Sequence, residues 1–378
     1  MIDASRRAAI SPFHVMEVMQ AAADRAALGG DVLHLEVGQP STSAPAGVRA
    51  AAHRAIDDDV IGYAVALGHE PLRHRIADHY RHWYGADVDP GRIVITAGAS
   101  AGCVLAILAA FDPGDRVAVS APGYPCYRNM LEALGVDAVP LAVDERTRFQ
   151  PTVELLDRAG PLDGVVIASP SNPTGTMLDG PALTSLLDHC RTTGVRVIAD
   201  EIYHGITFGE PAPTAATNEQ VVVVNSFSKY FSMTGWRLGW TVLPPELVTP
   251  VERLTQNLYI APSTLSQHAA MAAFDCHDEL EANVARYAEN RTVLLEGLAE
   301  AGFERLAPAD GAFYVYAAVD HLTDDSQALC ARWLDELGIA ATPGVDFDPE
   351  RGHQWVRFSF AGATAQIALA VERLRSSG

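Results

Sequence analysis

The middle of the chain alternates short runs rich in valine and isoleucine with stretches whose apolar residues recur at helical spacing. Short runs of this composition are typical of buried strands. The runs are Arg92 to Thr96, Arg116 to Ser120, Val165 to Ala168, Val195 to Ala199, Val221 to Asn225 and Leu238 to Leu243. Helical spacing is seen around them in Cys103 to Phe111, Leu183 to Cys190 and Leu265 to Phe274. Because strands that alternate with helices pair in parallel, the pattern predicts an α/β fold with a mostly parallel sheet.

The pattern changes in the last quarter of the chain, which predicts a second and smaller unit. A long polar helix is predicted from Glu279 to Gly302, followed by Gly311 to Val319, a helix from Asp325 to Leu337, a strand pair ending in Val356 to Phe360, and a final helix. A strand predicted from Val32 to Val37 joins this unit. We therefore predict a large domain over residues 46–280 and a small α+β domain formed by residues 1–45 and 281–378. A chain of 378 residues is long enough for both cores.

Charge and cysteine usage exclude several classes of function. The 47 acidic and 27 basic residues give a net charge of −20, which opposes binding to nucleic acid or to anionic membranes. The five cysteines are far apart, so neither a disulfide framework nor a zinc site is expected, and a reducing cytoplasm fits best. No apolar stretch approaches the ~18 residues of a membrane span, and no signal peptide is predicted.

Polar side chains follow the predicted strands where those strands end. Asn172, Asp200 and Lys229 each lie at or just after a strand, as does the turn Gly98-Ala99-Ser100. The carboxyl ends of parallel strands share one edge of a sheet, so we expect these residues to converge there.

These residue types match the needs of pyridoxal 5'-phosphate. Lys229 is predicted to form the imine with the cofactor aldehyde and to move the substrate Cα proton, whereas the ordinary alternative is a surface lysine. Asp200 is predicted to hold the pyridine nitrogen protonated, although an N-cap or an ordinary ion pair would also explain it. Tyr203 and Asn172 can hydrogen-bond the phenolic oxygen of the ring.

Further residues suit the rest of the cofactor and a substrate carboxylate. Arg237 is a candidate phosphate ligand, together with Ser226 and the backbone N–H groups of Ala99 and Ser100. Tyr124 either stacks on the ring or is a core aromatic. Arg357 lies in an alternating strand, where it binds the substrate α-carboxylate or forms an internal salt bridge.

With these residues placed, the chain resembles the class I and II aminotransferases, the aspartate-aminotransferase-like group of fold-type I pyridoxal-phosphate enzymes. The resemblance covers nearly the whole chain. Its further motifs are Gly38-Gln39-Pro40, Tyr63 with Gly68 and Leu72-Arg73, Asp112-Pro113-Gly114-Asp115, Gly311-Ala312-Phe313-Tyr314, Pro343-Gly344 and the terminal Arg357. One departure is visible, because the family often has Phe-Gly after Pro-Gly and this chain has Phe347-Asp348.

The resemblance implies a seven-stranded sheet sandwiched by helices, and a homodimer in which Tyr63 of the partner subunit reaches the cofactor phosphate. It also implies that Gly38 and the segment from Ile10 to Phe13 close over the substrate, with the small domain moving as a lid. The predicted reaction transfers an amino group from an L-amino acid to a 2-oxo acid by ping-pong kinetics, through a Lys229 aldimine and pyridoxamine phosphate. No residue is assigned to the substrate's side chain.

Other functions remain open at this point. The same fold serves carbon–sulfur lyases, cyclopropane-forming synthases and amino-acid oxidases. Gly98 to Gly102 also matches the nucleophile elbow G-x-S-x-G, which makes Ser100, with Asp346 and His353, a remote serine-hydrolase candidate. A transcriptional sensor would need a DNA-binding module, for which no segment remains. His74, His79 and His82 lack further ligands, so we predict a solvated helix face and no metal site.

Overall fold

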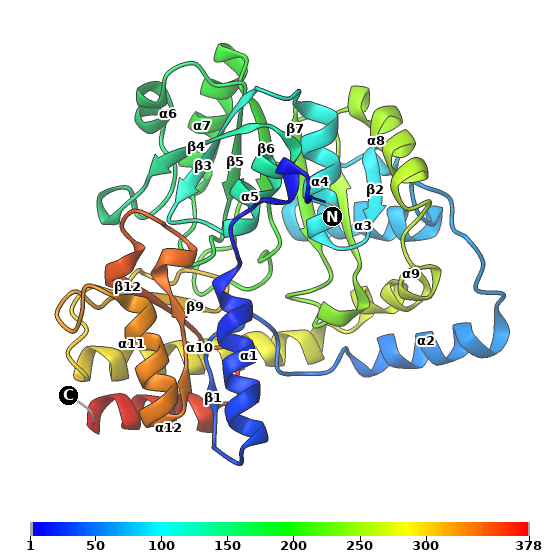
Figure 1. The fold of residues 1–378 in the computed structure, drawn as a ribbon. Helices are drawn as coiled ribbons and strands as arrows, with labels where there is room; N and C mark the ends of the chain where they lie inside the picture. Colours follow the sequence, from blue (N-terminus) through cyan, green and yellow to red (C-terminus); the bar gives the residue numbers. More distant parts are fainter. Residues whose placement is uncertain (1–2, 377–378) are drawn as a thin grey trace.

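The computed structural model describes residues 3–376, and its core is a seven-stranded sheet (Figure 1). The strands are β2 (Ile93–Thr96), β3 (Arg116–Ala121), β4 (Asp137–Ala142), β5 (Gly164–Ala168), β6 (Arg196–Asp200), β7 (Val221–Ser226) and β8 (Gly239–Val242). Their order across the sheet is β2-β8-β7-β6-β5-β3-β4. The five strands from β4 to β7 are parallel, and β8 is antiparallel to both β7 and β2. The predicted mostly parallel sheet is confirmed.

Strand β4 is the one strand of this sheet that the sequence pattern did not reveal. It contains Pro140 and has no unbroken valine run. Proline removes a backbone donor and is therefore tolerated mainly on edge strands. β4 pairs only with β3 and forms one edge of the sheet, which explains both its composition and why it was missed.

Alternate residues of the central strands pack into two separate hydrophobic cores, one on each face of the sheet. Val222 and Val224 belong to one core, whereas Val221 and Val223 belong to the other. The helices of this unit are α2 (Ala46–Asp58), α3 (Glu70–Tyr84), α4 (Ala99–Ala110), α5 (Pro125–Leu134), α6 (Val153–Ala159), α7 (Gly180–Thr193), α8 (Pro245–Leu258) and α9 (Thr264–Ala270). They cover both faces, so strands buried on both sides are apolar throughout (Figure 1).

A second group of elements lies at one end of the large sheet (Figure 1). Strands β11 (Thr342–Pro343), β12 (Trp355–Ser359) and β9 (Tyr314–Ala318) form an antiparallel sheet, and β1 (Leu33–His34) pairs in parallel with β10 (Ile339–Ala340). The helices here are α1 (His14–Ala27), α10 (His277–Glu300), α11 (Ser326–Arg332), the π-helical turn Trp333–Leu337 and α12 (Thr364–Ser376). Short 3-10 segments are Arg6–Ala8, Pro90–Arg92, Glu145–Thr147, Thr234–Trp236, Met271–Asp275, Gly344–Asp346 and Gly352–Gln354.

Two sequence-based details need correction here. The strand predicted from Val32 to Val37 is only two residues long, because Leu33–His34 alone finds a partner in β10. His79 is not on a solvated face, since it is 8% exposed and packs 4.4 Å from Trp83 and 5.4 Å from Phe274. Burial lowers the pKa of His79 to about 3, so the ring is a neutral core residue.

Within residues 3–376, no helix is both long enough and apolar enough to cross a membrane.

Candidate active site

A cavity of about 240 Å³ opens at the carboxyl ends of the central strands, between the large sheet and the smaller group of elements. Most of the predicted site residues line it: Gly38, Ala99, Ser100, Tyr124, Asn172, Asp200, Tyr203, Lys229, Arg237 and Arg357. Two do not. Ser226 is buried in the β7 end, and Tyr63 lies on the surface, 87% exposed. Asn172, Asp200, Lys229 and the turn at Ala99 and Ser100 therefore do converge at the carboxyl edge of the large sheet, and Arg357 reaches the same cavity from β12 of the smaller sheet.

Lys229 lies just after β7, in the loop that leads toward β8. Its Nζ donates a hydrogen bond of 2.6 Å to the carbonyl oxygen of Gly38. Burial of the ammonium, together with the positive charges of Arg357 and Arg237, lowers the pKa of Lys229 to about 8, and Asp200 opposes the change. Lys229 is also the only lysine in the sequence. A lysine with a lowered pKa has the neutral amine that nucleophilic and base chemistry need.

Asp200 is the last residue of β6 and is 4% exposed. It accepts hydrogen bonds from the Tyr127 hydroxyl at 2.5 Å and from the Ile202 backbone N–H at 3.0 Å. Burial raises the pKa of Asp200, against the effect of these hydrogen bonds and of Lys229. In the described part of the chain no cationic side chain forms a salt bridge with it. A carboxylate that is buried without a salt bridge at a cavity wall is suited to a cationic ring nitrogen.

Arg357 lies in the middle of β12 and is 2% exposed. Its guanidinium donates to the Asn172 side-chain oxygen at 2.9 Å, to the Thr342 hydroxyl at 3.1 Å and to the Glu36 carbonyl. No carboxylate of residues 3–376 forms a salt bridge with it, and Nε has no hydrogen-bond partner among them. Arg357 therefore forms no internal salt bridge with the described residues, which was the alternative explanation of its position. A buried guanidinium without an anion is a fitting site for a substrate carboxylate.

Tyr314 is a site residue to which the sequence assigned no role, although its motif was noted. Its hydroxyl hydrogen-bonds that of Tyr203 at 2.8 Å, and its ring lies 4.5 Å from the Arg357 guanidinium. Gly38 makes this placement possible, since a Cβ atom there would lie 1.6 Å from the Tyr314 hydroxyl oxygen. A side chain at position 38 of the Gly38-Gln39-Pro40 turn would therefore clash with Tyr314, which explains the glycine there.

We expect the Gly38→Ala substitution to displace Tyr314 and to lower both stability and activity. The overlap at 1.6 Å cannot be relieved by small shifts, and overpacking of this kind costs about 1–3 kcal/mol. Tyr314 would then lose its contacts with Tyr203 and Arg357. Thermal unfolding and kcat/KM for the amino donor measure the two effects. Gly180→Ala is the control, because a Cβ there meets nothing within 4 Å; equal behaviour of the two variants would contradict the steric argument.

The far end of the cavity suits a phosphate. Ala99 and Ser100 begin α4, where backbone N–H groups point out of the helix, and Gly98 before them has a φ of 83°. The Arg237 guanidinium lies next to this turn, 3.5 Å from the Ser228 hydroxyl. Ser228 lines the cavity and was not predicted. Ser226 does not line the cavity: its hydroxyl hydrogen-bonds the Leu238 carbonyl at 3.0 Å and the Ser228 hydroxyl at 2.9 Å, so its role as a phosphate ligand stays a prediction.

One wall of the cavity is apolar and comes from the N-terminal segment. Phe13, Val15, Met16 and Met19 line it. The Phe13 ring lies 6.0 Å from the Tyr124 ring, edge to face. Of the segment from Ile10 to Phe13, which is predicted to close over the substrate, Phe13 lines the cavity, and helix α1 adds residues that no local pattern assigned.

The fit of these residues to pyridoxal phosphate rests on three observations. Asp200 is a buried carboxylate that lacks a cation, Lys229 is a lysine with a lowered pKa, and Arg237 stands beside the exposed N–H groups of a helix start. These are the groups that the ring nitrogen, the aldehyde and the phosphate require. The residues present fit the cofactor.

The rate at which the apoprotein captures pyridoxal phosphate is expected to rise about tenfold per pH unit up to about pH 8 and then to level off. Only the neutral amine attacks the aldehyde, and the pKa of Lys229 is lowered to about 8 from the ordinary 10.5. The cofactor absorbance change in a stopped-flow series measures this rate, with Nα-acetyl-lysine as the reference for titration of the cofactor itself. A rate that keeps rising to pH 10 would show that Lys229 titrates like a free lysine.

The serine-hydrolase alternative lacks its partners. Ser100 is the second residue of α4, and no histidine is among the described residues that line the cavity. Asp346 accepts hydrogen bonds from the backbone N–H groups of His14 and Val15 instead of orienting a histidine. A serine nucleophile needs a histidine or an equivalent base within hydrogen-bond reach.

Comparison with known proteins agrees with this geometry. Residues 30–374 match the family described as Aminotransferase class I and II. A valine–pyruvate aminotransferase of Mycobacterium tuberculosis is 50% identical over 98% of this chain and 97% of its own length. A (5-formylfuran-3-yl)methyl phosphate transaminase of Methanocaldococcus jannaschii is 31% identical over 96% of both chains. The crystal structure of an aminotransferase from Mycobacterium tuberculosis superposes with a TM-score of 0.98 at 48% identity, covering 100% of this chain and 99% of the other.

Proposed function

This chain belongs to the class I and II aminotransferases, which depend on pyridoxal phosphate, and we propose that it moves the amino group of an apolar L-amino acid to a small 2-oxo acid such as pyruvate. The observation that carries the substrate class is the charge of the cavity. Its cationic lining residues are Lys229, Arg237 and Arg357. With these assigned to the cofactor and the α-carboxylate, no cation of the described cavity wall is left for a second carboxylate. The valine–pyruvate activity named for the 50% identical relative supports the same class.

The α-carboxylate of the substrate is assigned to Arg357. Its guanidinium lies 4.5 Å from the ring of Tyr314 and 4.8 Å from that of Phe347 and donates hydrogen bonds to Asn172 and Thr342, so its orientation is set before the substrate arrives. Asn172 accepts from this guanidinium through its side-chain oxygen, which leaves its amide N–H groups as donors toward the cavity. Asn172 would therefore contact both the arginine that binds the substrate carboxylate and the cofactor.

Bound pyridoxal phosphate supplies the electron sink that makes the substrate Cα–H bond acidic. Lys229 holds and moves this proton, for which its amine must be neutral, as a lowered pKa favours. Asp200 would accept a hydrogen bond from the protonated ring nitrogen, and Tyr203 would donate one to the phenolic oxygen. The phosphate would be held by Arg237, Ser228 and the N–H groups of Ala99 and Ser100, and Tyr124 would pack against the ring.

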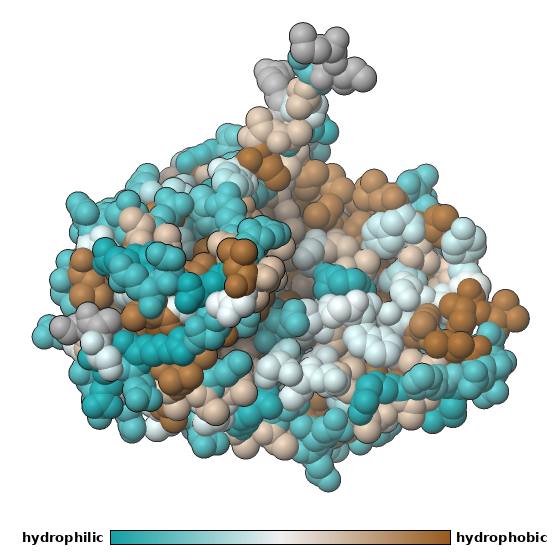
Figure 2. Space-filling model, turned by 60° about the horizontal axis from the view of Figure 1, so that its bottom comes forward, coloured by the Kyte–Doolittle hydropathy of each residue, from teal (hydrophilic) through white to brown (hydrophobic). Residues whose placement is uncertain are grey.

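We also propose a homodimer in which the partner subunit's Tyr63 completes each phosphate site. Residues 56–65 expose a run of apolar side chains, with Ile56 at 57%, Val60 at 95% and Val65 at 64% exposure. Figure 2 shows hydrophobic side chains gathered on the right-hand edge of one face. Apolar surface of this kind is favoured for burial between subunits. Sedimentation of the protein at several concentrations tests the assembly, and a monomer with full activity would refute it.

The division into residues 46–280 and residues 1–45 with 281–378 is likewise proposed, with the smaller unit acting as a lid. Its boundary falls within the continuous helix α10, which would then link the two units. A cytoplasmic location is proposed because all five cysteines are free in this fold.

The test is the reaction of the cofactor-loaded protein with L-valine and pyruvate, measured as L-alanine and 3-methyl-2-oxobutanoate formed in equal amounts. L-Aspartate replaces valine in a parallel assay. Preference for aspartate would overturn the apolar substrate class. Release of ammonia without consumption of pyruvate would indicate lyase or oxidase chemistry. Parallel lines in double-reciprocal plots at several pyruvate concentrations are expected for the two half-reactions.

A further inference from the structure

Helix α1 supplies an apolar wall of the active site, and different contacts hold its two ends. Its C-terminal half packs through Ala22 onto Leu334 and Ala340, and Arg25 donates to the Asp335 carbonyl at 2.9 Å. The residues that face the cavity, Phe13 to Met19, lie at the other end of the helix. In Figure 1, this N-terminal end of α1 is the end nearer to the large sheet. The contacts that hold the N-terminal end of α1 therefore also determine the position of this apolar wall.

That end is held by Asp346, which lies 332 residues further along the chain. One carboxylate oxygen accepts the His14 N–H at 3.1 Å and the other accepts the Val15 N–H, also at 3.1 Å. The helix has no side-chain cap of its own, since the residue at the N-cap position is Phe13. Asp346 is 2% exposed. A carboxylate at this position satisfies two free donors and opposes the positive end of the helix dipole.

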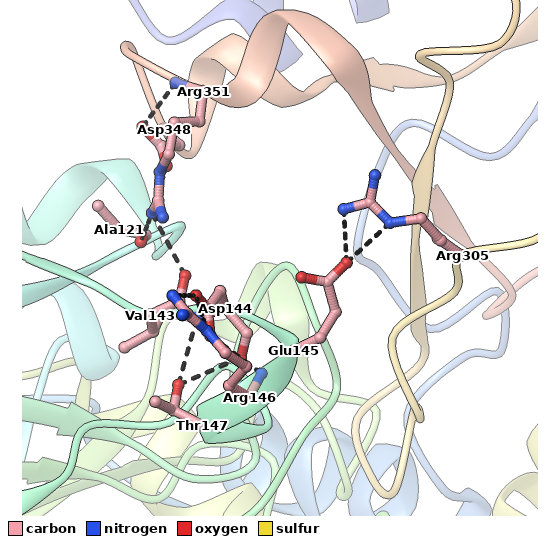
Figure 3. Close-up of polar contacts among 9 residues, drawn as sticks. All are labelled: Ala121, Val143, Asp144, Glu145, Arg146, Thr147, Arg305, Asp348 and Arg351. Carbon is pink, nitrogen blue, oxygen red and sulfur yellow. Dashed lines mark hydrogen bonds and ion pairs between the residues drawn. The ribbon is translucent and has the colours of Figure 1, made fainter.

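The loop that carries Asp346 is itself tied to the large sheet. Figure 3 shows Arg351 reaching from this loop to the backbone carbonyls of Ala121 and Val143, at the ends of β3 and β4. Asp348 orients Arg351 through an ion pair of 2.8 Å. The Gly123 N–H donates to the Phe347 carbonyl at 3.1 Å. The departure from Phe-Gly at Phe347-Asp348 thus has a structural role in this chain.

The same loop also contacts the carboxylate-binding arginine, because the Phe347 ring lies 4.8 Å from the Arg357 guanidinium. Neighbouring residues of one loop therefore contact both parts of the proposed substrate site. Phe347 packs against Arg357, which would bind the carboxylate, and Asp346 caps α1, whose wall would contact the side chain. A shift of α1 changes the space for the side chain while Arg357 stays where it is.

We propose that Asp346 is a positioning residue for substrate specificity, which sets the distance between Arg357 and the apolar wall of α1 by capping that helix from another part of the fold. This inference rests on the proposed apolar amino-acid substrate. The side chain of valine has two more carbon atoms than that of alanine and therefore more apolar surface to bury against this wall. Loss of the cap should therefore affect valine more than alanine.

The experiment compares kcat/KM for L-valine and for L-alanine in the cofactor-loaded wild type and in Asp346→Asn, with one fixed 2-oxo acid that yields neither donor. The amide keeps one acceptor oxygen but sets its NH₂ group against a backbone N–H. We expect the valine-to-alanine ratio of kcat/KM to fall about tenfold, mainly through KM for valine. Backbone amides of residues 14–19 should exchange hydrogen faster in the apoprotein as well.

A second variant and a matched control make the test specific. His14→Pro removes one of the two donors at the first helical position, where proline is well tolerated. Combined with Asp346→Asn it leaves the amide oxygen free for the Val15 N–H, so the double variant should recover part of the lost ratio. Asp179→Asn is the control. Asp179 is the N-cap residue of α7, accepts the Ala182 N–H at 2.8 Å and does not line the cavity.

The outcomes separate the two proposals. If the valine-to-alanine ratio and the exchange of residues 14–19 both match those of Asp179→Asn, Asp346 does not position the wall and the inference fails. If exchange rises but the ratio is unchanged, Asp346 caps α1 without affecting specificity, and the inference also fails. If the wild type itself accepts neither amino acid, the proposed substrate class fails, and the exchange result still reports on the cap.

Discussion

Turnover should fall by on the order of 10⁴-fold or more when Lys229 is replaced by alanine, because one side chain both joins the cofactor and moves the proton. No other lysine exists in the sequence to take over either task. Reduction of the cofactor-loaded protein with borohydride, followed by peptide mass spectrometry, should attach the cofactor to the peptide that contains Lys229 and to no other lysine. The variant should carry no such label. Initial rates with the preferred donor measure the loss.

The control for this substitution is Lys229→Arg. Arginine keeps a positive charge and can still donate to the Gly38 carbonyl, but it stays protonated and forms no imine. It should therefore be as inactive as the alanine variant while its thermal unfolding stays closer to that of the wild type. Activity of either variant within tenfold of the wild type would refute the assignment of Lys229.

The second large effect is expected for Asp200→Asn, whose kcat should fall by about 10²–10⁴-fold. An amide of the same shape cannot keep the ring nitrogen protonated, so the electron sink that helps Lys229 remove the proton is weakened. The amide also has one acceptor oxygen where the carboxylate has two, of which one accepts from the Tyr127 hydroxyl and the other from the Ile202 N–H. Steady-state kcat and the affinity of the apoprotein for pyridoxal phosphate measure the two consequences.

Glu201→Gln is the matched control, since Glu201 is the next residue and a carboxylate buried to a similar degree. It accepts from Thr214 and from the Ala215 N–H, and it does not line the cavity. Burial raises the pKa of Glu201 to about 8, so its neutral form is readily reached. We expect this variant to keep most of the activity. Equal losses in both variants would mean that Asp200 acts through general stability and not on the ring.

The polar ends of the strands illustrate what local sequence can reveal. Asn172, Asp200 and Lys229 follow apolar runs whose length and composition are set by burial within a parallel sheet. The geometry of such sheets brings their carboxyl ends together, so the convergence of these three residues follows from patterns of a few residues each. Strand β4 was not predicted because the composition of an edge strand is less restricted by burial and backbone pairing, so it can contain Pro140.

Residues that depend on distant partners had no such signal. Ser228 and Ser226 are two residues apart, and only the path of the loop decides that Ser228 faces the cavity. Tyr314 becomes a site residue because the missing side chain of Gly38 leaves space for its hydroxyl. The local sequence predicted His79 on a polar helix face, whereas in the folded chain it packs against Trp83 and Phe274.

The sequence by itself determined the class of sheet and the polar residues that gather at its carboxyl edge, because periodicity and residue type at strand ends are local properties. The tertiary structure alone decided which residues form the apolar wall of the cavity. Asp346 and His14 are 332 residues apart, and neither local sequence indicates the hydrogen bond between them. The shape of the cavity depends on how separate elements are held against one another, and that arrangement exists only after the chain has folded.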